Sequence, residues 1–240
     1  MVVPYKESDL GKKQQVEQMF DNIAHRYDLL NRVLSLGIDT LWRKKVVKLL
    51  AATQPKLVLD MATGTADLAI ASSNIKGVKI KGVDLSENML AKGRIKIIDK
   101  GLNTQIELLK GDSEKILFDD NTFDAATVAF GVRNFENLNA GIKELRRVIK
   151  PNGRLFVLEF SQPTGFPYKQ IYHFYFKNIL PFVGRIFSKD SSAYTYLPDS
   201  VQAFPDGERF KKVLNDCGFV DIQIYPLTFG TATIYSAQKN

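Results

Sequence analysis

Residues 57–67, LVLDMATGTAD, decide the fold class of this chain. The first five form a short apolar run with an acid, Asp60, near its end, which is typical of a buried strand. The next six are small or polar, and a helical pattern resumes at Leu68. A buried strand, a tight turn and a helix in this order predict the first unit of a parallel α/β sheet.

On the C-terminal side of this stretch, apolar runs and helical patterns continue to alternate. We predict further strands at residues 78–84, 104–109, 123–130 and 154–160. Helices are predicted at residues 86–100, capped by Ser86, and 136–150, ended by Pro151 and Gly153. Five strands that alternate with helices predict a parallel sheet covered on both faces.

The two flanks of this core have different patterns. Within residues 1–54, apolar residues recur at spacings of three and four over 12–35, and Asp39 is the predicted N-cap of a second helix. We interpret this segment as a helical lid. Residues 55–161 form the predicted cofactor-binding core, and residues 162–206 form an aromatic and basic insert.

The last segment, residues 207–240, completes a single predicted domain. A helix is expected at 207–217, followed by strands at 219–225 and 228–238. The short connection between these strands predicts an antiparallel pair at the edge of the sheet.

Composition excludes several classes of protein. The chain has 240 residues, of which 45% are hydrophobic and 25% charged, as in a soluble globular domain. Its single cysteine, Cys217, excludes an intramolecular disulfide and a cysteine-based zinc cluster, and its two histidines, His25 and His173, leave little material for a histidine-rich metal site. We find no signal peptide or membrane span and expect a cytoplasmic protein. The net charge of +7 favours binding to polyanions or to an anionic membrane surface. The alternative is that this charge serves only to keep the protein soluble.

Acids are predicted at the carboxyl ends of the first three strands, where open parallel sheets bind ligands. Asp60 lies near the end of the first strand, Asp84 ends the second, and Asp112 follows the third. Gly64 permits a tight turn and a close approach of the backbone to a ligand. Ala66 permits an approach that is nearly as close, provided that its φ is negative. A carboxylate at the end of the second strand can accept hydrogen bonds from ribose hydroxyls.

This pattern favours S-adenosylmethionine over a dinucleotide. A dinucleotide needs a G-x-G-x-x-G loop for its pyrophosphate, whereas residues 64–69, GTADLA, keep only the first glycine. Asp60 and Asp67 would repel a pyrophosphate and attract a sulfonium or ammonium group. The alternative interpretation of Asp60 is an organiser of the loop.

Several blocks of sequence carry a family resemblance. They are FDNIA at 20–24, YDLLN at 27–31, VLD at 58–60, GTAD at 64–67, VDLSENML at 83–90, FGVRN at 130–134 and RVIKPNG at 147–153. With them the chain resembles the ubiquinone/menaquinone biosynthesis C-methyltransferases, from about Val16 to the C-terminus. The resemblance implies a class I Rossmann-like methyltransferase fold, with a mostly parallel seven-stranded sheet, an antiparallel C-terminal edge and an N-terminal helical lid.

The resemblance also implies the residues of the cofactor site. They are Asp60, Gly64, Thr65, Asp84, Asp112 and Ser113. Thr65 is expected to bond the methionine end of S-adenosyl-L-methionine. Asp84 is expected at the ribose, and Asp112 and Ser113 at the adenine.

Four positions depart from the family pattern. Asp39 stands where the family usually has a histidine, which weakens any role for that histidine as a base here. Ala66 and Asn152 replace glycines, and Ala129 stands where some members have a serine. None of these departures changes the acids of the predicted site.

The implied reaction is transfer of a methyl group to a ring carbon of a lipid quinol, foremost demethylmenaquinol. Arg133, Asn134 and Tyr27 are the expected catalytic residues. Arg133 would stabilise a phenolate or orient a water. The alternatives are a surface ion pair for Arg133, a helix cap for Asn134 and a core position for Tyr27. His173 either flanks the ring or is a stacking or surface residue.

Residues 166–187 are aromatic and basic, and polar residues interrupt their apolar pattern. They predict either an interfacial stretch, which contacts the membrane that holds the quinol tail, or an ordinary lid helix. The sequence does not indicate an oligomeric state.

Other functions remain open at this level. The substrate could instead be a ubiquinone precursor or another small molecule, and a non-catalytic nucleoside-binding module is a further class. Nucleic acid is not an expected partner, because no Asn-Pro-Pro-Tyr type motif follows the strand at 123–130 and the basic residues form no stripe.

Overall fold

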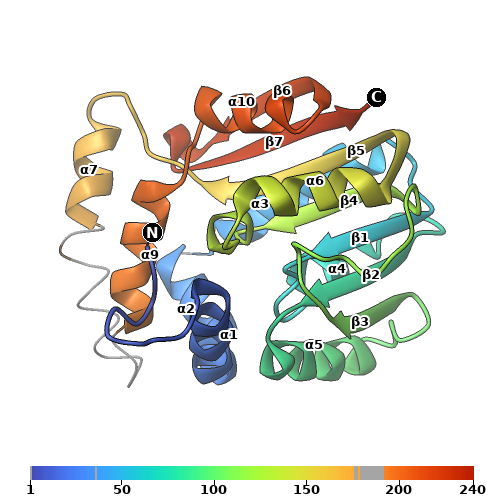
Figure 1. Ribbon diagram of the computed structural model, residues 1–240, viewed down its shortest axis with the longest axis horizontal. Coiled ribbons are helices and arrows are strands. Elements are labelled where there is room, and N and C mark those ends of the chain that lie inside the picture. Colours follow the sequence, from blue (N-terminus) through green and yellow to red (C-terminus); the bar gives the residue numbers. More distant parts are fainter. Residues whose placement is uncertain (1, 36, 176–177, 179–191) are drawn as a thin grey trace.

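The computed structural model describes residues 2–35, 37–175, 178 and 192–240. It contains one seven-stranded sheet with the strand order β3-β2-β1-β4-β5-β7-β6. The strands are β1 Leu57–Met61, β2 Lys79–Asp84, β3 Ile106–Lys110, β4 Phe123–Ala129, β5 Ile149–Phe160, β6 Phe219–Leu227 and β7 Ala232–Lys239. Figure 1 shows helices packed on both sides of this sheet.

The described helices are distributed along the whole chain. They are α1 Lys12–Ile23, α2 Tyr27–Leu34, α3 Asp39–Ala51, α4 Asp67–Ser72, α5 Glu87–Asp99, α6 Leu138–Val148, α7 Tyr168–Phe174, α9 Ser192–Ala203 and α10 Glu208–Asp216. Three short 3-10 turns accompany them, η1 Ala24–Arg26, η2 Val132–Asn134 and η4 Thr228–Gly230.

The strand pairing confirms the predicted fold class. Strand β1 pairs in parallel with β2 on one side and β4 on the other, and β3 and β5 extend the parallel part outward. Strand β7 pairs antiparallel with both β5 and β6. The strand order therefore reverses beside β1, and a ligand site is expected at the carboxyl ends of β1 and β4.

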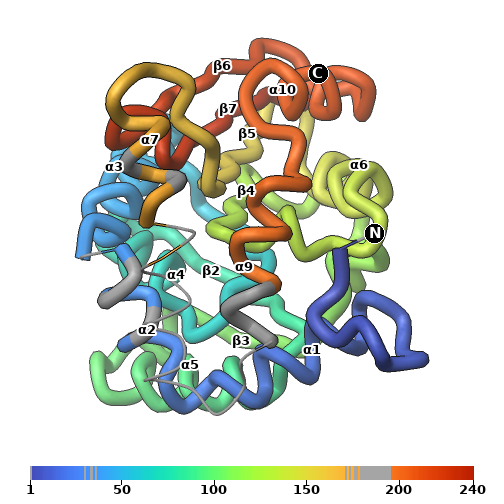
Figure 2. Tube along the Cα trace, turned by 90° about the vertical axis from the view of Figure 1, so that its left-hand side faces the viewer, coloured from blue at the N-terminus to red at the C-terminus, as the bar shows by residue number. Residues whose placement is uncertain are grey.

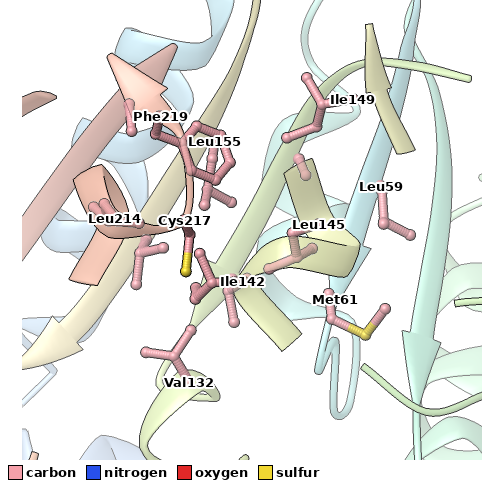
Figure 3. Packing of buried hydrophobic residues seen from close by; sticks show 14 of the residues in the cluster. Leu59, Met61, Val132, Ile142, Leu145, Ile149, Leu155, Leu214, Cys217 and Phe219 are labelled. Atoms are coloured by element: carbon pink, nitrogen blue, oxygen red, sulfur yellow. The ribbon is translucent and has the colours of Figure 1, made fainter. Parts of the chain in front are cut away.

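Alternating residues of the central strands enter two separate cores. Leu59 and Leu155 pack on one face of the sheet with Ile142 of α6 and Leu214 of α10, as Figure 3 shows. The opposite face packs against α3, α4 and α5 through another buried cluster that includes Trp42. Because a buried parallel sheet leaves both faces apolar, this two-sided packing fixes the strands whose ends carry the site.

The N-terminal helices lie at the carboxyl ends of the parallel strands. Figures 1 and 2 show α1 and α2, together with α9, across this end of the sheet. The predicted continuous helix over 12–35 is wrong, because the 3-10 turn at Ala24–Arg26 separates α1 from α2. Apolar spacings of three and four suit both kinds of helix, so periodicity could not detect this change.

Two backbone predictions are also corrected. Asp39 is not the N-cap of α3 but its first helical residue, and its side chain is 7% exposed and paired with Arg43. Ala66 has a φ of 66°, in the left-handed region, so the condition of a negative φ for close approach of a ligand at this residue is not met. Its amide donates to the carbonyl of Thr63 at 2.9 Å, so the tight turn before α4 imposes this conformation.

The aromatic insert contains α7 and α9. Its residues 176–177 and 179–191 lie outside the described part of the chain, as does the side chain of His173, so the predictions for them stay predictions. Among the described residues, no helix is long and apolar enough to cross a bilayer.

Candidate functional site

A cavity of about 680 Å³ lies where the sheet order reverses. Its walls come from the ends of the first four strands and from helix α1. Of the six predicted cofactor residues it is lined by Gly64, Asp84, Asp112 and Ser113. Its walls are mainly apolar with a few polar side chains, as is typical of small-molecule and cofactor sites.

Gly64 forms the floor of this cavity beneath the lid. Its φ is +56°, and a Cβ atom built on it would lie 3.8 Å from Cε1 of Tyr27. Only a residue without a side chain leaves the space between the loop and Tyr27 open, and only glycine adopts this φ without strain. The predicted close approach of backbone to ligand is therefore possible here.

Asp84 both shapes the loop and faces the cavity. Its Oδ2 atom accepts from the amide of Gly64 at 2.8 Å, and its Oδ1 atom accepts from the amide of Ser86 at 2.9 Å. Burial raises the pKa of this carboxyl, and the backbone hydrogen bonds oppose that shift. Each carboxylate oxygen has a second lone pair, with which it can accept a ligand hydroxyl.

Helix α1 joins the acids at the end of β3. Nζ of Lys13 lies 2.6 Å from Oδ2 of Asp112 and 3.5 Å from Oε2 of Glu114. Glu17 and Glu136 also line the cavity. The carboxylates in this wall outnumber the single lysine, so the cavity favours a cationic ligand over a phosphate.

Asp60 lies behind the loop rather than in the main cavity. It is 2% exposed, and its two oxygens accept from the hydroxyls of Thr63 and Thr127, both at 2.6 Å. Burial raises its pKa to about 6. This geometry supports the alternative interpretation of Asp60, an organiser that ties β1, β4 and the loop together.

Thr65 also points away from the main cavity. Its Oγ1 atom donates to Oδ1 of Asp28 at 2.5 Å and accepts from Nζ of Lys96 at 3.0 Å. With Asp60 it lines a smaller pocket of about 340 Å³ beside the loop. The expected bond from Thr65 to the methionine end of a cofactor would have to replace this contact with the lid.

A second cavity of about 770 Å³ adjoins the first. The two share the residues Phe20, Tyr27, Phe130 and Asn134. The second cavity is mainly apolar and aromatic, but polar groups from Arg43 and Arg133 also reach it. A flat aromatic ligand with a few oxygens fits these walls.

Arg133 in this second cavity is a buried ion pair, not the surface pair that we had considered. Its Nη1 atom lies 2.6 Å from Oε1 of Glu159, whose side chain is fully buried. Nη1 also donates to the carbonyl of Phe130 at 2.6 Å. The Nε atom is buried and has no hydrogen-bond partner among the described residues, while other atoms of Arg133 line the cavity.

Asn134 is held on both sides of its amide group. Its Nδ2 atom donates to the carbonyl of Phe130 at 3.3 Å, and its Oδ1 atom accepts from the hydroxyl of Tyr196 at 3.1 Å. The following helix is capped by Asn137, whose Oδ1 accepts from the amide of Ala140. The helix-cap alternative for Asn134 is therefore wrong.

Tyr27 stands between the two cavities, at the start of α2. Its ring packs edge-on against Phe20, with 5.9 Å between the centroids. Burial raises the pKa of its phenol, whereas a hydrogen bond with Asn31 and the charge of Arg133 lower it. The structure thus brings Tyr27, Arg133 and Asn134 to one cavity.

Sequence reasoning missed the partners of these residues. Glu159 lies in an apolar strand, and a buried acid there signals a partner, but nothing in the sequence identifies Arg133 as that partner. Tyr196 and Arg43 belong to distant helices with no local sign of a common site. The described residues contain no cluster of acids, histidines or cysteines that could hold a metal ion.

The ubiE/COQ5 methyltransferase family model matches residues 8–239. This chain belongs to that family. Membership confirms the predicted family and the enzyme class, and every residue of the two cavities falls within the matched range.

Relatives in this methyltransferase family match over nearly the whole chain. A demethylmenaquinone methyltransferase from Bacteroides fragilis is 46% identical over 239 residues, covering 99% of this chain and 97% of the relative. A protein named "Ubiquinone/menaquinone biosynthesis C-methyltransferase UbiE" from Citrifermentans bemidjiense is 46% identical over 230 residues, covering 95% and 97%.

Solved structures show that the fold is shared more widely than the family. A SAM-dependent methyltransferase from Thermotoga maritima has a TM-score of 0.65 at 18% identity, covering 93% of this chain and 99% of that chain. The cyclase SpnF has a TM-score of 0.67 at 16% identity, covering 95% and 96%. Because one neighbour is a cyclase, the fold alone does not decide the reaction.

Proposed function

We propose that this methyltransferase transfers a methyl group from S-adenosyl-L-methionine to a ring carbon of demethylmenaquinol. One observation carries the proposal: an acid-lined cavity and an aromatic cavity meet at Tyr27, Phe130 and Asn134. Two ligands in these cavities would touch at that common wall. The family membership and the name of the Bacteroides fragilis relative support both the reaction and the substrate.

The first cavity fits the cofactor. Asp84 offers oxygens to ribose hydroxyls, and Asp112 and Ser113 offer polar groups to the adenine. The excess of carboxylates suits a ligand with a sulfonium and an ammonium group. When bound there, S-adenosylmethionine would supply an electrophilic methyl group: the bond from sulfur to methyl breaks as the ring carbon bonds the methyl, S-adenosylhomocysteine is left, and the ring carbon then loses its proton.

Residues of the second cavity would prepare the ring carbon of the quinol to attack the methyl group. Phe130 and Phe160, with centroids 4.6 Å apart, form an aromatic wall for the ring. The guanidinium of Arg133 in the cavity wall can donate to a ring oxygen and stabilise the phenolate form, which makes the ring carbon electron-rich. Tyr27 and Asn134 at the common wall would align the carbon with the methyl group and exclude water.

A ubiquinone precursor is the second candidate substrate. The relative from Citrifermentans bemidjiense carries both quinones in its name at the same identity of 46%. A benzoquinol has the same paired ring oxygens as a naphthoquinol but one ring fewer. The two differ in how completely they would fill the aromatic cavity.

We also propose contact with a lipid surface through the corner formed by α7 and η4. Phe166, Phe174 and Phe229 are 83%, 61% and 66% exposed, and the ring of Tyr168 stacks on Phe229 at 3.8 Å. Exposed aromatic residues are characteristic of interfacial segments. Sedimentation with anionic liposomes at low salt tests this contact, and protein that stays in the supernatant would rule it out.

Mass spectrometry of a methyl-transfer reaction tests the function. The purified protein is mixed with S-adenosylmethionine and either reduced demethylmenaquinone or reduced 2-methoxy-6-polyprenyl-benzoquinone. We expect the naphthoquinol to gain one methyl group faster than the benzoquinol. Turnover of the benzoquinol alone would favour the second candidate, and turnover of neither would contradict the proposal.

A further inference from the structure

The aromatic cavity contains another buried ion pair, which the proposed reaction has not used. Arg43 of α3 pairs through Nη1 with Oδ2 of Asp39, and the two residues are 9% and 5% exposed. Oδ1 of Asp39 accepts from the hydroxyl of Ser35 at 2.7 Å. All three residues line the second cavity.

Stability does not explain this pair. Removing two charges from water is costly, and a buried pair is often no more stabilising than well-packed apolar residues. Here the pair lies in a cavity wall rather than in the packed core. Only one nitrogen of the Arg43 guanidinium, Nη1, bonds Asp39. A guanidinium has several other N–H donors, which can bond a ligand.

The surroundings of Arg43 match those of Arg133. The Cζ atom of Arg43 lies 5.6 Å from the centroid of the Phe130 ring, and Cζ of Arg133 lies 5.4 Å from that of Phe160. The two rings form the aromatic wall described above. Each arginine is thus held by one buried acid and packed against one ring of the same pair.

Helix α3 holds Arg43 in a fixed place. The neighbouring Trp42 packs against both Phe130 and Phe160, at centroid distances of 6.1 Å and 6.2 Å. Its Nε1 atom donates to Oγ1 of Thr228 at 2.8 Å, which joins α3 to the connection between β6 and β7. A donor anchored in this way loses little freedom when it binds a ligand.

We infer that Arg43, positioned by Asp39, binds one of the two ring oxygens of the quinol while Arg133 binds the other. This inference rests on the proposed function, because it requires a substrate with two oxygens on opposite sides of one ring. Two anchors would fix which ring carbon faces the methyl group. Arg43 would then determine orientation as well as affinity.

Two prenylated naphthols test the inference, each lacking a different one of the two hydroxyls of demethylmenaquinol. Both are measured as competitive inhibitors of quinol methylation by the wild type and by Arg43→Gln. We expect Arg43→Gln to raise the inhibition constant of one naphthol about 10-fold, which is the usual effect of losing a hydrogen bond to a charged group. The inhibition constant of the other naphthol should stay within about 2-fold of its wild-type value. Arg43→Lys should restore part of the loss.

Further variants separate binding from folding. Asp39→Asn should weaken inhibition by the same naphthol, but less than Arg43→Gln does. This variant removes the carboxylate that positions Arg43 and keeps Arg43 itself. Arg209→Gln, an exposed arginine of α10, is the matched control and should change neither inhibition constant. Far-UV circular dichroism spectra should match that of the wild type in all the variants, which shows that they fold; Arg43 also lines the pocket of Thr65, so the affinity for S-adenosylmethionine is measured separately.

The possible results distinguish this inference from the proposed function. Equal weakening of both naphthols, or no weakening of either, would overturn the role of Arg43 while wild-type methylation of the quinol leaves the function intact. If the wild type binds S-adenosylmethionine but methylates no naphthoquinol, the proposed function and this inference both fail.

Discussion

Nη1 of Arg133 lies 2.6 Å from Oε1 of Glu159, and this pair links the turn after β4 to the end of β5. Both side chains are almost completely buried. Burial raises the pKa of Glu159, while the charge of Arg133 lowers it. The acid fixes the guanidinium in the wall of the aromatic cavity, where its accessible donors can meet a ligand.

Replacing Arg133 should remove transition-state stabilisation without harming the cofactor site. We expect Arg133→Gln to lower kcat about 100-fold, the usual effect of losing one donor to a developing oxyanion. The dissociation constant of S-adenosylmethionine should stay the same, and the exposed Arg209→Gln should behave as the wild type. Quinol turnover close to wild type in Arg133→Gln would remove Arg133 from the reaction.

Replacing Glu159, the ion-pair partner of Arg133, should mainly lower the stability of the protein. Glu159→Gln leaves the guanidinium of Arg133 buried without a counter-charge, which costs about 3 to 5 kcal/mol of unfolding free energy. Chemical denaturation followed by fluorescence measures this loss. A variant as stable as the wild type would show that the pair is not as buried as described.

Asp84 should control affinity for the cofactor. We expect Asp84→Asn to raise the dissociation constant of S-adenosylmethionine about 10- to 100-fold, because a charged acceptor is lost at the ribose and at the Gly64 loop. Calorimetric titration checks this, with the exposed Asp119→Asn as control. Unchanged affinity in Asp84→Asn would place the ribose elsewhere.

Asp60 should produce a pH-dependent stability difference. The pKa of Asp60 in the folded protein, about 6, lies above the ordinary value of 3.8, so the folded state binds its proton more tightly than the unfolded state. The contribution of Asp60 to the free energy of unfolding therefore falls as the pH rises from 3.8 to 6. Asp60→Asn has no such group. Its stability relative to the wild type should therefore increase by about 2 to 3 kcal/mol from pH 4 to pH 7. Urea unfolding of both proteins at each pH measures the difference, and a constant difference would show that Asp60 ionises normally.

The contact between the lid and the loop should govern the mobility of α2. Nζ of Lys96 lies 3.0 Å from Oδ2 of Asp28 and also pairs with Asp67. We expect Lys96→Gln to speed amide hydrogen exchange in residues 27–34 about 2- to 5-fold, the effect of a partly exposed ion pair. The exposed Lys92→Gln on the same helix is the control. Equal exchange in both variants would mean that other contacts close the lid.

The order of strands and helices could be predicted because it is encoded locally. The apolar run at Leu57–Met61 forms β1 with the predicted ends, and the glycine loop lies where the strand order reverses. Acids that directly follow buried strands are placed at one edge by the parallel topology alone. For this reason the positions of Asp84 and Asp112 in one cavity followed from the sequence.

Contacts between distant segments could not be predicted in this way. The family resemblance assigned Thr65 to the cofactor, but its hydroxyl meets Asp28 from a helix 37 residues earlier. Likewise, nothing near Arg43 in the sequence indicates that α3 packs beside Phe130. These are tertiary pairings, and local patterns contain no information about them.

The central claim is methyl transfer to carbon at the meeting point of the two cavities. It is tested most directly by NMR spectroscopy of the product formed from demethylmenaquinol and S-adenosylmethionine with an isotope-labelled methyl group. We predict one labelled methyl resonance in the range of methyl groups attached to an aromatic carbon. A labelled methyl attached to oxygen, or no labelled quinone at all, would contradict the account.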